Sequence, residues 1–120
     1  MTGITERVLQ SSVRAQARSV PSVMMNLVEE VGELARALNR PHRCDEPPIA
    51  EIADVLNCAI DLAFMLEISE CINPRESDYN VIAETVQRRL EYFVDKKCDK
   101  WDKIVQKMGR SKDGEPGESI

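Results

Sequence analysis

The sequence predicts an all-α fold, a helical bundle of about four helices that is completed by oligomerisation. Aromatic residues make up only 4% of the 120 residues, and the apolar residues are mainly aliphatic. These residues recur at steps of three and four along most of the chain, which is the period of an amphipathic helix. A domain of this length buries a small core on its own, so we expect copies of the chain to pack together.

Prolines and polar breaks divide the chain into four predicted helices. The first covers residues 4–18. Pro21 fits the first turn of the second, which extends to about residue 39, and Pro48 fits the first turn of the third, which extends to residue 68. Ser77 or Asp78 can cap a fourth helix that extends to residue 108. The predicted apolar face of the second helix consists of Met24, Leu27, Val28, Val31, Leu34, Ala35 and Leu38.

The end of the chain differs in composition from the rest. From Gly109 onward the sequence RSKDGEPGESI has almost no apolar residues. Too little apolar surface can be buried there to offset the entropy lost on ordering. We therefore expect a helical domain over residues 1–108 and a disordered tail over residues 109–120.

The composition argues against several classes of protein. A net charge of −5 does not provide the basic face that a nucleic-acid backbone requires. The cysteines are widely spaced and His42 is the only histidine, which does not match a structural zinc site. No targeting sequence and no apolar run of membrane-spanning length is found. The sequence thus predicts a reduced, cytoplasmic protein without a nucleic-acid or membrane partner.

Polar side chains interrupt the predicted third helix, which is otherwise apolar. Glu51, Asp54, Asn57 and Asp61 follow one another at steps of three and four. At about 100° per residue, they lie along one narrow stripe. Buried carboxylates need compensation for their charge, from an arginine or from a metal ion. The candidate arginines are Arg14, Arg18 and Arg36.

The second helix carries a matching group of acids, Glu29, Glu30 and Glu33. These acids lie opposite the predicted apolar face, which is typical of a solvated surface. If the two helices pack side by side, however, Glu30 and Glu33 can join Glu51 and Asp54 in one site. A ligand set of oxygens alone, without histidine or cysteine, favours Mg²⁺ or Mn²⁺ over zinc or copper.

Two segments carry a resemblance to a known family. LVEEVGELARAL (residues 27–38) and EIADVLNCAIDLA (residues 51–63) resemble the all-α nucleoside triphosphate pyrophosphohydrolases of the MazG-like superfamily. An EExxE helix followed by an ExxD helix marks this family. The corresponding residues here are Glu29, Glu30 and Glu33, then Glu51 and Asp54.

The resemblance implies hydrolysis of an NTP or dNTP between the α and β phosphates, with Mg²⁺ as the cofactor and Mn²⁺ as a substitute. Carried over, Glu30, Glu33, Glu51 and Asp54 are the metal ligands. Glu29 is the base that orients the attacking water, or a further ligand.

Substrate contacts are less well defined by the resemblance. Asn57 and Asp61 extend the metal-facing stripe, and each can either contact the nucleotide or form a hydrogen bond within the bundle. For Asp61 we expect the hydrogen bond within the bundle. The family places basic side chains near the phosphates from its last helix, which points to Lys97 and Lys100, although such lysines are also typical of a solvated face.

The resemblance further implies a homodimer or homotetramer. Within the same superfamily, phosphoribosyl-ATP pyrophosphohydrolase is an alternative activity. A third interpretation is a helical interaction protein without catalytic activity, in which the carboxylates form salt bridges.

Overall fold

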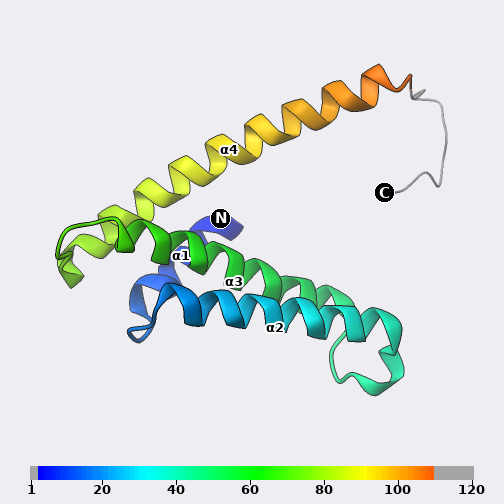
Figure 1. Cartoon of the computed structure of the whole chain (residues 1–120), viewed down its shortest axis with the longest axis horizontal. Coiled ribbons are helices and arrows are strands. Elements are labelled where there is room, and N and C mark those ends of the chain that lie inside the picture. The colour runs from blue at the N-terminus through cyan, green and yellow to red at the C-terminus, as the bar shows by residue number, and fades with distance from the viewer. Residues whose placement is uncertain (1–2, 110–120) are drawn as a thin grey trace. The chain divides into compact units, whose positions relative to one another are not determined.

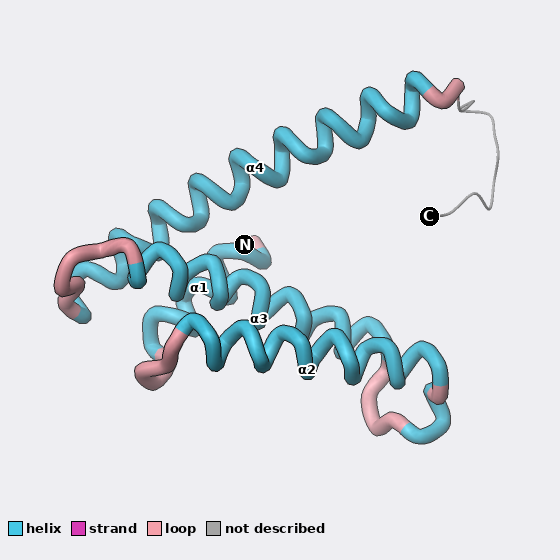
Figure 2. Tube along the Cα trace, viewed as in Figure 1, coloured by secondary structure: helices cyan, strands magenta, loops and turns pink. Residues whose placement is uncertain are grey.

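The computed structural model describes residues 3–109, and all regular structure in this range is helical, with no strand (Figures 1 and 2). The all-α prediction is therefore confirmed. The four α-helices are α1 (Ile4–Arg14), α2 (Val20–Asn39), α3 (Pro48–Ser69) and α4 (Tyr79–Lys107), and two short 3₁₀ helices cover Pro41–Arg43 and Glu76–Asp78. Nearly all of the predicted tail, residues 110–120, lies outside the described residues. None of the described helices combines the length and the apolar character needed to cross a bilayer.

The chain divides into two compact units between Gln87 and Arg88. In the first unit, α2 and α3 lie side by side and run in opposite directions, and α1 packs against α3 (Figure 1). The second unit contains the remainder of α4, whose side chains are almost all exposed.

The core of the first unit is built by three helices and the start of α4. Phe64 of α3 is 1% exposed, and the edge of the Tyr79 ring meets it with 6.0 Å between the ring centres. Leu9 of α1 and Val86 of α4 are also buried. Edge-to-face ring packing adds to the free energy gained from burial alone, so these contacts join the start of α4 to the bundle.

The first helix ends earlier than predicted. It stops at Arg14, and Ala15 has an extended backbone with ψ of 159°, so the predicted extension to Arg18 is wrong. Arg18 instead turns back and donates hydrogen bonds to the backbone carbonyls of Ser12 and Gln16. The Ser12 carbonyl lies in the last turn of α1 and also accepts a hydrogen bond of 3.3 Å from the Ala15 backbone N–H. The arginine is thus a second donor to a carbonyl at the end of this helix.

The face of α2 that packs against the bundle is also not the predicted one. Val23 and Ala37 are buried, whereas Leu27, Glu30 and Leu34 are half-buried. This face is rotated by one residue from the predicted stripe, because α2 has two adjacent apolar stripes and only one of them packs on α3. The five residues of the predicted apolar face that are exposed instead are Met24, Val28, Val31, Ala35 and Leu38.

Candidate metal centre

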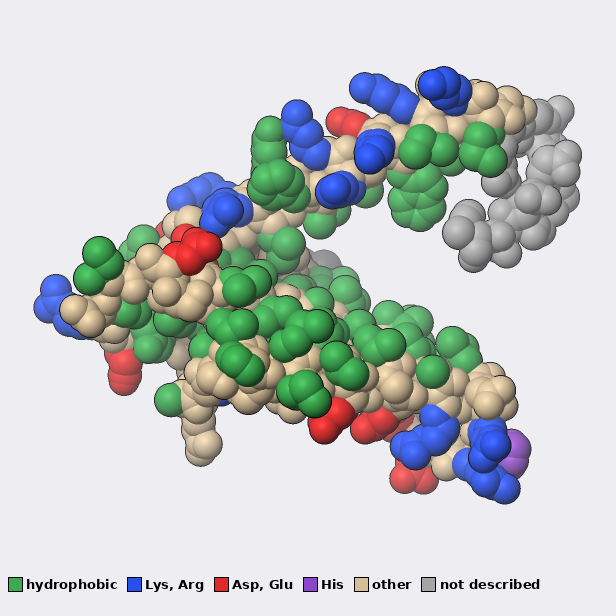
Figure 3. Space-filling view, viewed as in Figure 1, with side chains coloured by type: hydrophobic (Ala, Val, Ile, Leu, Met, Phe, Trp, Pro, Cys, Tyr) green, Lys and Arg blue, Asp and Glu red, His purple; other side chains and the backbone are tan. Residues whose placement is uncertain are grey.

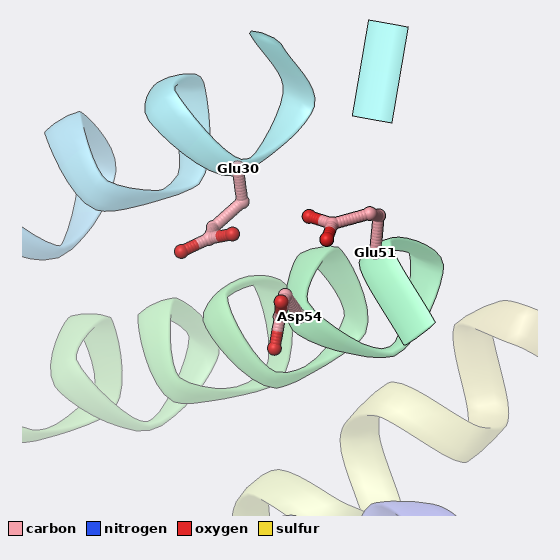
Figure 4. A group of neighbouring side chains, drawn as sticks. All are labelled: Glu30, Glu51 and Asp54. Atoms are coloured by element: carbon pink, nitrogen blue, oxygen red, sulfur yellow. The ribbon is translucent and has the colours of Figure 1, made fainter. Parts of the chain in front are cut away.

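Carboxylates from two helices converge in the first unit. Glu30 comes from α2, and Glu51 and Asp54 come from the first half of α3 (Figure 4). One oxygen of each carboxylate lies within 4.8 Å of the others. The three-residue step from Glu51 to Asp54 places both on one side of α3, and the rotated packing of α2 turns Glu30 towards them.

The carboxylates are poorly satisfied by the protein itself. Glu51 is only 8% exposed. One oxygen of Glu30 and one of Glu51 are buried without a hydrogen-bond partner among residues 3–109. Buried polar atoms in native proteins are nearly always paired, and an unpaired charge is costly. A cation bound between the carboxylates removes this penalty, and an all-oxygen set suits a hard divalent ion such as Mg²⁺ or Mn²⁺.

The electrostatics of the group support the same conclusion. Burial raises the pKa of Glu30, and the negative charges of Asp54, Glu33 and Glu29 raise it further. Burial likewise raises the pKa of Glu51, with further contributions from Asp54, Glu46 and Glu33. Burial and like charges both disfavour the ionised form. The negative charge at this site is therefore under-compensated by the described protein groups.

The other predicted acids occupy different positions. Glu29 and Glu33 are exposed on α2, outside the group of three, although Glu33 contributes to the pKa of both Glu30 and Glu51. Asp61 is held by Arg18, which donates two hydrogen bonds to the carboxylate, one of 3.0 Å from Nε and one shorter bond from Nη2. The expectation that Asp61 bonds within the bundle is confirmed.

Lys97 and Lys100, the predicted phosphate contacts, are exposed on the part of α4 that belongs to the second unit. Asn57 is exposed on α3. It lines a cavity of about 440 Å³ between α1 and α3, together with Arg7, Ser11, Cys58 and Asp61.

A cavity and a cleft are each lined in part by residues of α3. Cys58 lines the cavity at Asn57; burial raises the pKa of its thiol, and the charges of Glu30, Asp61 and Asp54 raise it further. The cleft, of about 390 Å³, includes Glu51 at the start of α3. Asp54 lies between them in the sequence. Along the sequence of α3, the cleft residue Glu51 therefore comes before Asp54, and the cavity residue Asn57 comes after it.

Sequence reasoning named Glu33 and Glu51 as site residues but missed the side chains that the 3₁₀ helix and the loop add to this cleft. Its walls come from the end of α2, the 3₁₀ helix at residues 41–43 and the following loop. It is lined by Glu33, Arg36, Arg43, Cys44, Asp45, Glu46 and Glu51. No periodicity links a loop to a helix, so only the folded path of residues 40–47 brings Arg43 and Glu46 to this site.

Comparisons of the chain with protein-family models, with curated proteins and with solved structures find no match.

Proposed function

We propose that the protein is a Mg²⁺-dependent nucleoside triphosphate pyrophosphohydrolase, which hydrolyses a (d)NTP to the (d)NMP and pyrophosphate. The observation that carries the proposal is the convergence of Glu30, Glu51 and Asp54 with two buried oxygens that lack partners. These residues belong to the two segments that resemble the MazG-like superfamily. A purely structural role for the carboxylates predicts basic partners, and the one arginine paired with this stripe in the described chain, Arg18, binds Asp61 instead.

Different roles follow for the acids. Glu30, Glu51 and Asp54 hold the divalent ion, and the exposed Glu33 is a further ligand when the substrate is bound. A Mg²⁺ ion held there would neutralise phosphate charge and polarise the reacting phosphorus. Glu29 accepts a proton from the attacking water. The water oxygen forms a bond to the α phosphorus, the bond from that phosphorus to the bridging oxygen breaks, and pyrophosphate leaves with the bonding electrons.

The cavity at Asn57 is the proposed site of the nucleoside. Its volume of about 440 Å³ lies within the range of small-molecule sites. The Asn57 amide can both donate and accept hydrogen bonds. Arg7 donates to the Ser11 hydroxyl in the same wall, at 2.8 Å, so this wall is already ordered by hydrogen bonding.

Self-association is the second part of the proposal. Residues on α2 and α3 form an outer apolar face, and each is between 40% and 70% exposed. They are Met24, Val28, Val31, Leu38, Ile49, Ile52, Leu56 and Leu66. In Figure 3, hydrophobic side chains gather over these two helices.

The geometry of the outer apolar face suits a second copy of the chain. On α2, each member follows a residue of the face that packs on α3, so the outer stripe is rotated by roughly 100°. The outer stripe of α3 has a similar offset, and because the helices are antiparallel, both stripes point to one side. Each member of the outer apolar face is between 40% and 70% exposed, so a second copy that packs on this face removes apolar surface from water. Two such faces pack as a four-helix bundle, which makes a homodimer.

The activity is tested by release of pyrophosphate from a panel of NTPs, dNTPs and phosphoribosyl-ATP in the presence of Mg²⁺. We expect turnover with at least one (d)NTP, and a loss of about 100-fold or more in Asp54→Asn. Glu70→Gln, a change of an exposed acid at the end of α3, is the matched control and retains activity. Turnover of phosphoribosyl-ATP alone assigns the alternative branch, and no release from any substrate contradicts the proposal.

A further inference from the structure

The cleft that includes Glu51 contains two arginines. Arg36 is one turn beyond Glu33 on α2, so the two side chains lie on the same side of the helix. Arg43 ends the 3₁₀ helix at residues 41–43, and both arginines line the cleft with Glu46 and Glu51. Figure 3 shows Lys and Arg side chains gathered at this loop end of α2, with acidic side chains beside them.

Neither arginine is used by the fold. Among residues 3–109, the guanidinium groups of Arg36 and Arg43 take part in no ion pair or hydrogen bond, in contrast to Arg18, which binds Asp61. Glu51, in the same cleft, is more than nine-tenths buried and has a carboxylate oxygen without a partner. The cleft thus presents unpaired donors and an unpaired buried acceptor to the same space.

We infer that Arg36 and Arg43 are the anion-binding half of this cleft, and that the cleft binds pyrophosphate, as the leaving group of the substrate, in complex with a divalent cation. This inference rests on the proposed function and adds to it the position of the leaving group. Guanidinium groups bind phosphate oxygens in pairs of hydrogen bonds. Glu51 binds the cation that the pyrophosphate carries.

The charges in the cleft explain why a cation must accompany the anion. Four acids line the cleft against two arginines, so its net formal charge is −2. Free pyrophosphate is repelled by this charge. In a Mg²⁺–pyrophosphate complex, the Mg²⁺ ion can bind the carboxylates and the phosphate oxygens can bind the arginines. Binding of Mg²⁺ and pyrophosphate is therefore coupled, and each strengthens the other.

The resemblance to the MazG-like superfamily implies cleavage between the α and β phosphates, and the order of residues along α3 suits this proposal. Asn57 lines the proposed nucleoside cavity and Glu51 lines the cleft, and Asp54 lies between these two residues in the sequence. A nucleoside triphosphate that spans them places its first phosphorus at the carboxylates and its outer two phosphates at the arginines. Water attack at the carboxylates then yields the nucleoside monophosphate and pyrophosphate.

The test is isothermal titration calorimetry of the full chain with inorganic pyrophosphate, with and without Mg²⁺. We expect binding in Mg²⁺ and none in EDTA. Each of the changes Arg36→Gln and Arg43→Gln should weaken the affinity roughly 10-fold, as expected for a charged hydrogen bond. Arg40→Gln is the matched control, because Arg40 is an exposed arginine at the same helix end that does not line the cleft.

The outcomes separate the inference from the proposed function. Equal pyrophosphate affinity in the wild type and in both cleft variants overturns the inference, and so does equal binding in EDTA. If Arg40→Gln weakens the pyrophosphate affinity as much as the cleft variants do, the inference is overturned as well, because nonspecific attraction by positive charge then explains the binding. Calorimetry needs no turnover, so Mg²⁺-dependent pyrophosphate binding without NTP hydrolysis supports the cleft assignment and rejects the enzyme. Turnover of an NTP, together with unchanged pyrophosphate affinity in Arg36→Gln and Arg43→Gln, supports the enzyme and rejects the cleft assignment.

Discussion

The carboxylates of Glu30 on α2 and Glu51 on α3 face one another across the helix pair, and each has one buried oxygen without a hydrogen-bond partner among residues 3–109. Asp54 lies within the same group. Two packed helices thus hold negative charges together that the described protein groups do not neutralise. Such an arrangement lowers the stability of the apo protein and favours binding of a cation, because binding releases the repulsion.

Removal of one of these charges should stabilise the protein without metal. In EDTA, Glu51→Gln should raise the melting temperature by a few degrees, because the amide keeps the size of the side chain and carries no charge. The same change should reduce the stabilisation that Mg²⁺ gives the wild type. The measurement is a thermal melt with and without Mg²⁺. Glu6→Gln, at an exposed position on α1, is the control, and equal shifts in the two variants contradict the prediction.

The stability of the apo protein should fall as the pH rises from about 4.5. Burial and neighbouring charges raise the pKa of Glu30 and Glu51 above their ordinary value of 4.5. Between the ordinary and the raised pKa, the native state holds protons that the unfolded state has lost, so the free energy of unfolding decreases with pH. Below 4.5 both states are protonated and the penalty is absent.

Mg²⁺ should counteract this loss only where the carboxylates are ionised. Melting temperatures in EDTA and in Mg²⁺ should therefore diverge from pH 5 towards pH 8. Melts at constant ionic strength, with Na⁺ in place of Mg²⁺ as the control, measure the divergence. A Mg²⁺ effect that is the same at both ends of this range contradicts the prediction.

Much of the fold was readable from the sequence, because helix starts and breaks depend on local residues. Ser19 accepts a hydrogen bond from the Ser22 backbone N–H, with Pro21 in the first turn of α2, and Pro48 begins α3. The predicted end of α1 was four residues too late. A distant residue, Asp61, binds Arg18 and holds it outside the helix.

The candidate site was predictable in part, for a related reason. The step from Glu51 to Asp54 is a local property of one helix. The position of Glu30 depends on which of two neighbouring apolar stripes of α2 packs on α3, and both stripes have the same spacing. Arg36 and Arg43 reach the cleft through the path of a loop, and loop paths leave no periodic signal in a sequence.

The pair between Arg18 and Asp61 should contribute measurably to stability. Both side chains are about one-fifth exposed, at 19% and 21%, and Arg18 also binds backbone carbonyls at the end of α1. Asp61→Ala leaves a partly buried guanidinium without its carboxylate, which should lower the free energy of unfolding by about 1–3 kcal/mol.

Urea denaturation of the single variants and of the double variant Arg18→Ala/Asp61→Ala gives the coupling energy of the pair. Asp78→Ala is a comparison with an exposed acid whose carboxylate accepts a hydrogen bond from the Arg75 backbone N–H. Additive effects of Arg18→Ala and Asp61→Ala, with no coupling energy, contradict the structural role of the pair.

The outer apolar face should hold two copies of the chain together. Val31 on α2 and Leu56 on α3 are 48% and 42% exposed, on the side of the helix pair where both stripes point. Val31→Glu and Leu56→Glu each place a charge where the proposed dimer excludes water, so the dissociation constant should rise on the order of 100-fold. Sedimentation velocity over a range of concentrations measures this shift. Val81→Glu makes the same change at an exposed valine near the start of α4, outside this face, and should leave the dimer intact. A wild type that sediments as a monomer at every concentration, or three variants that dissociate alike, rules out this face as the contact.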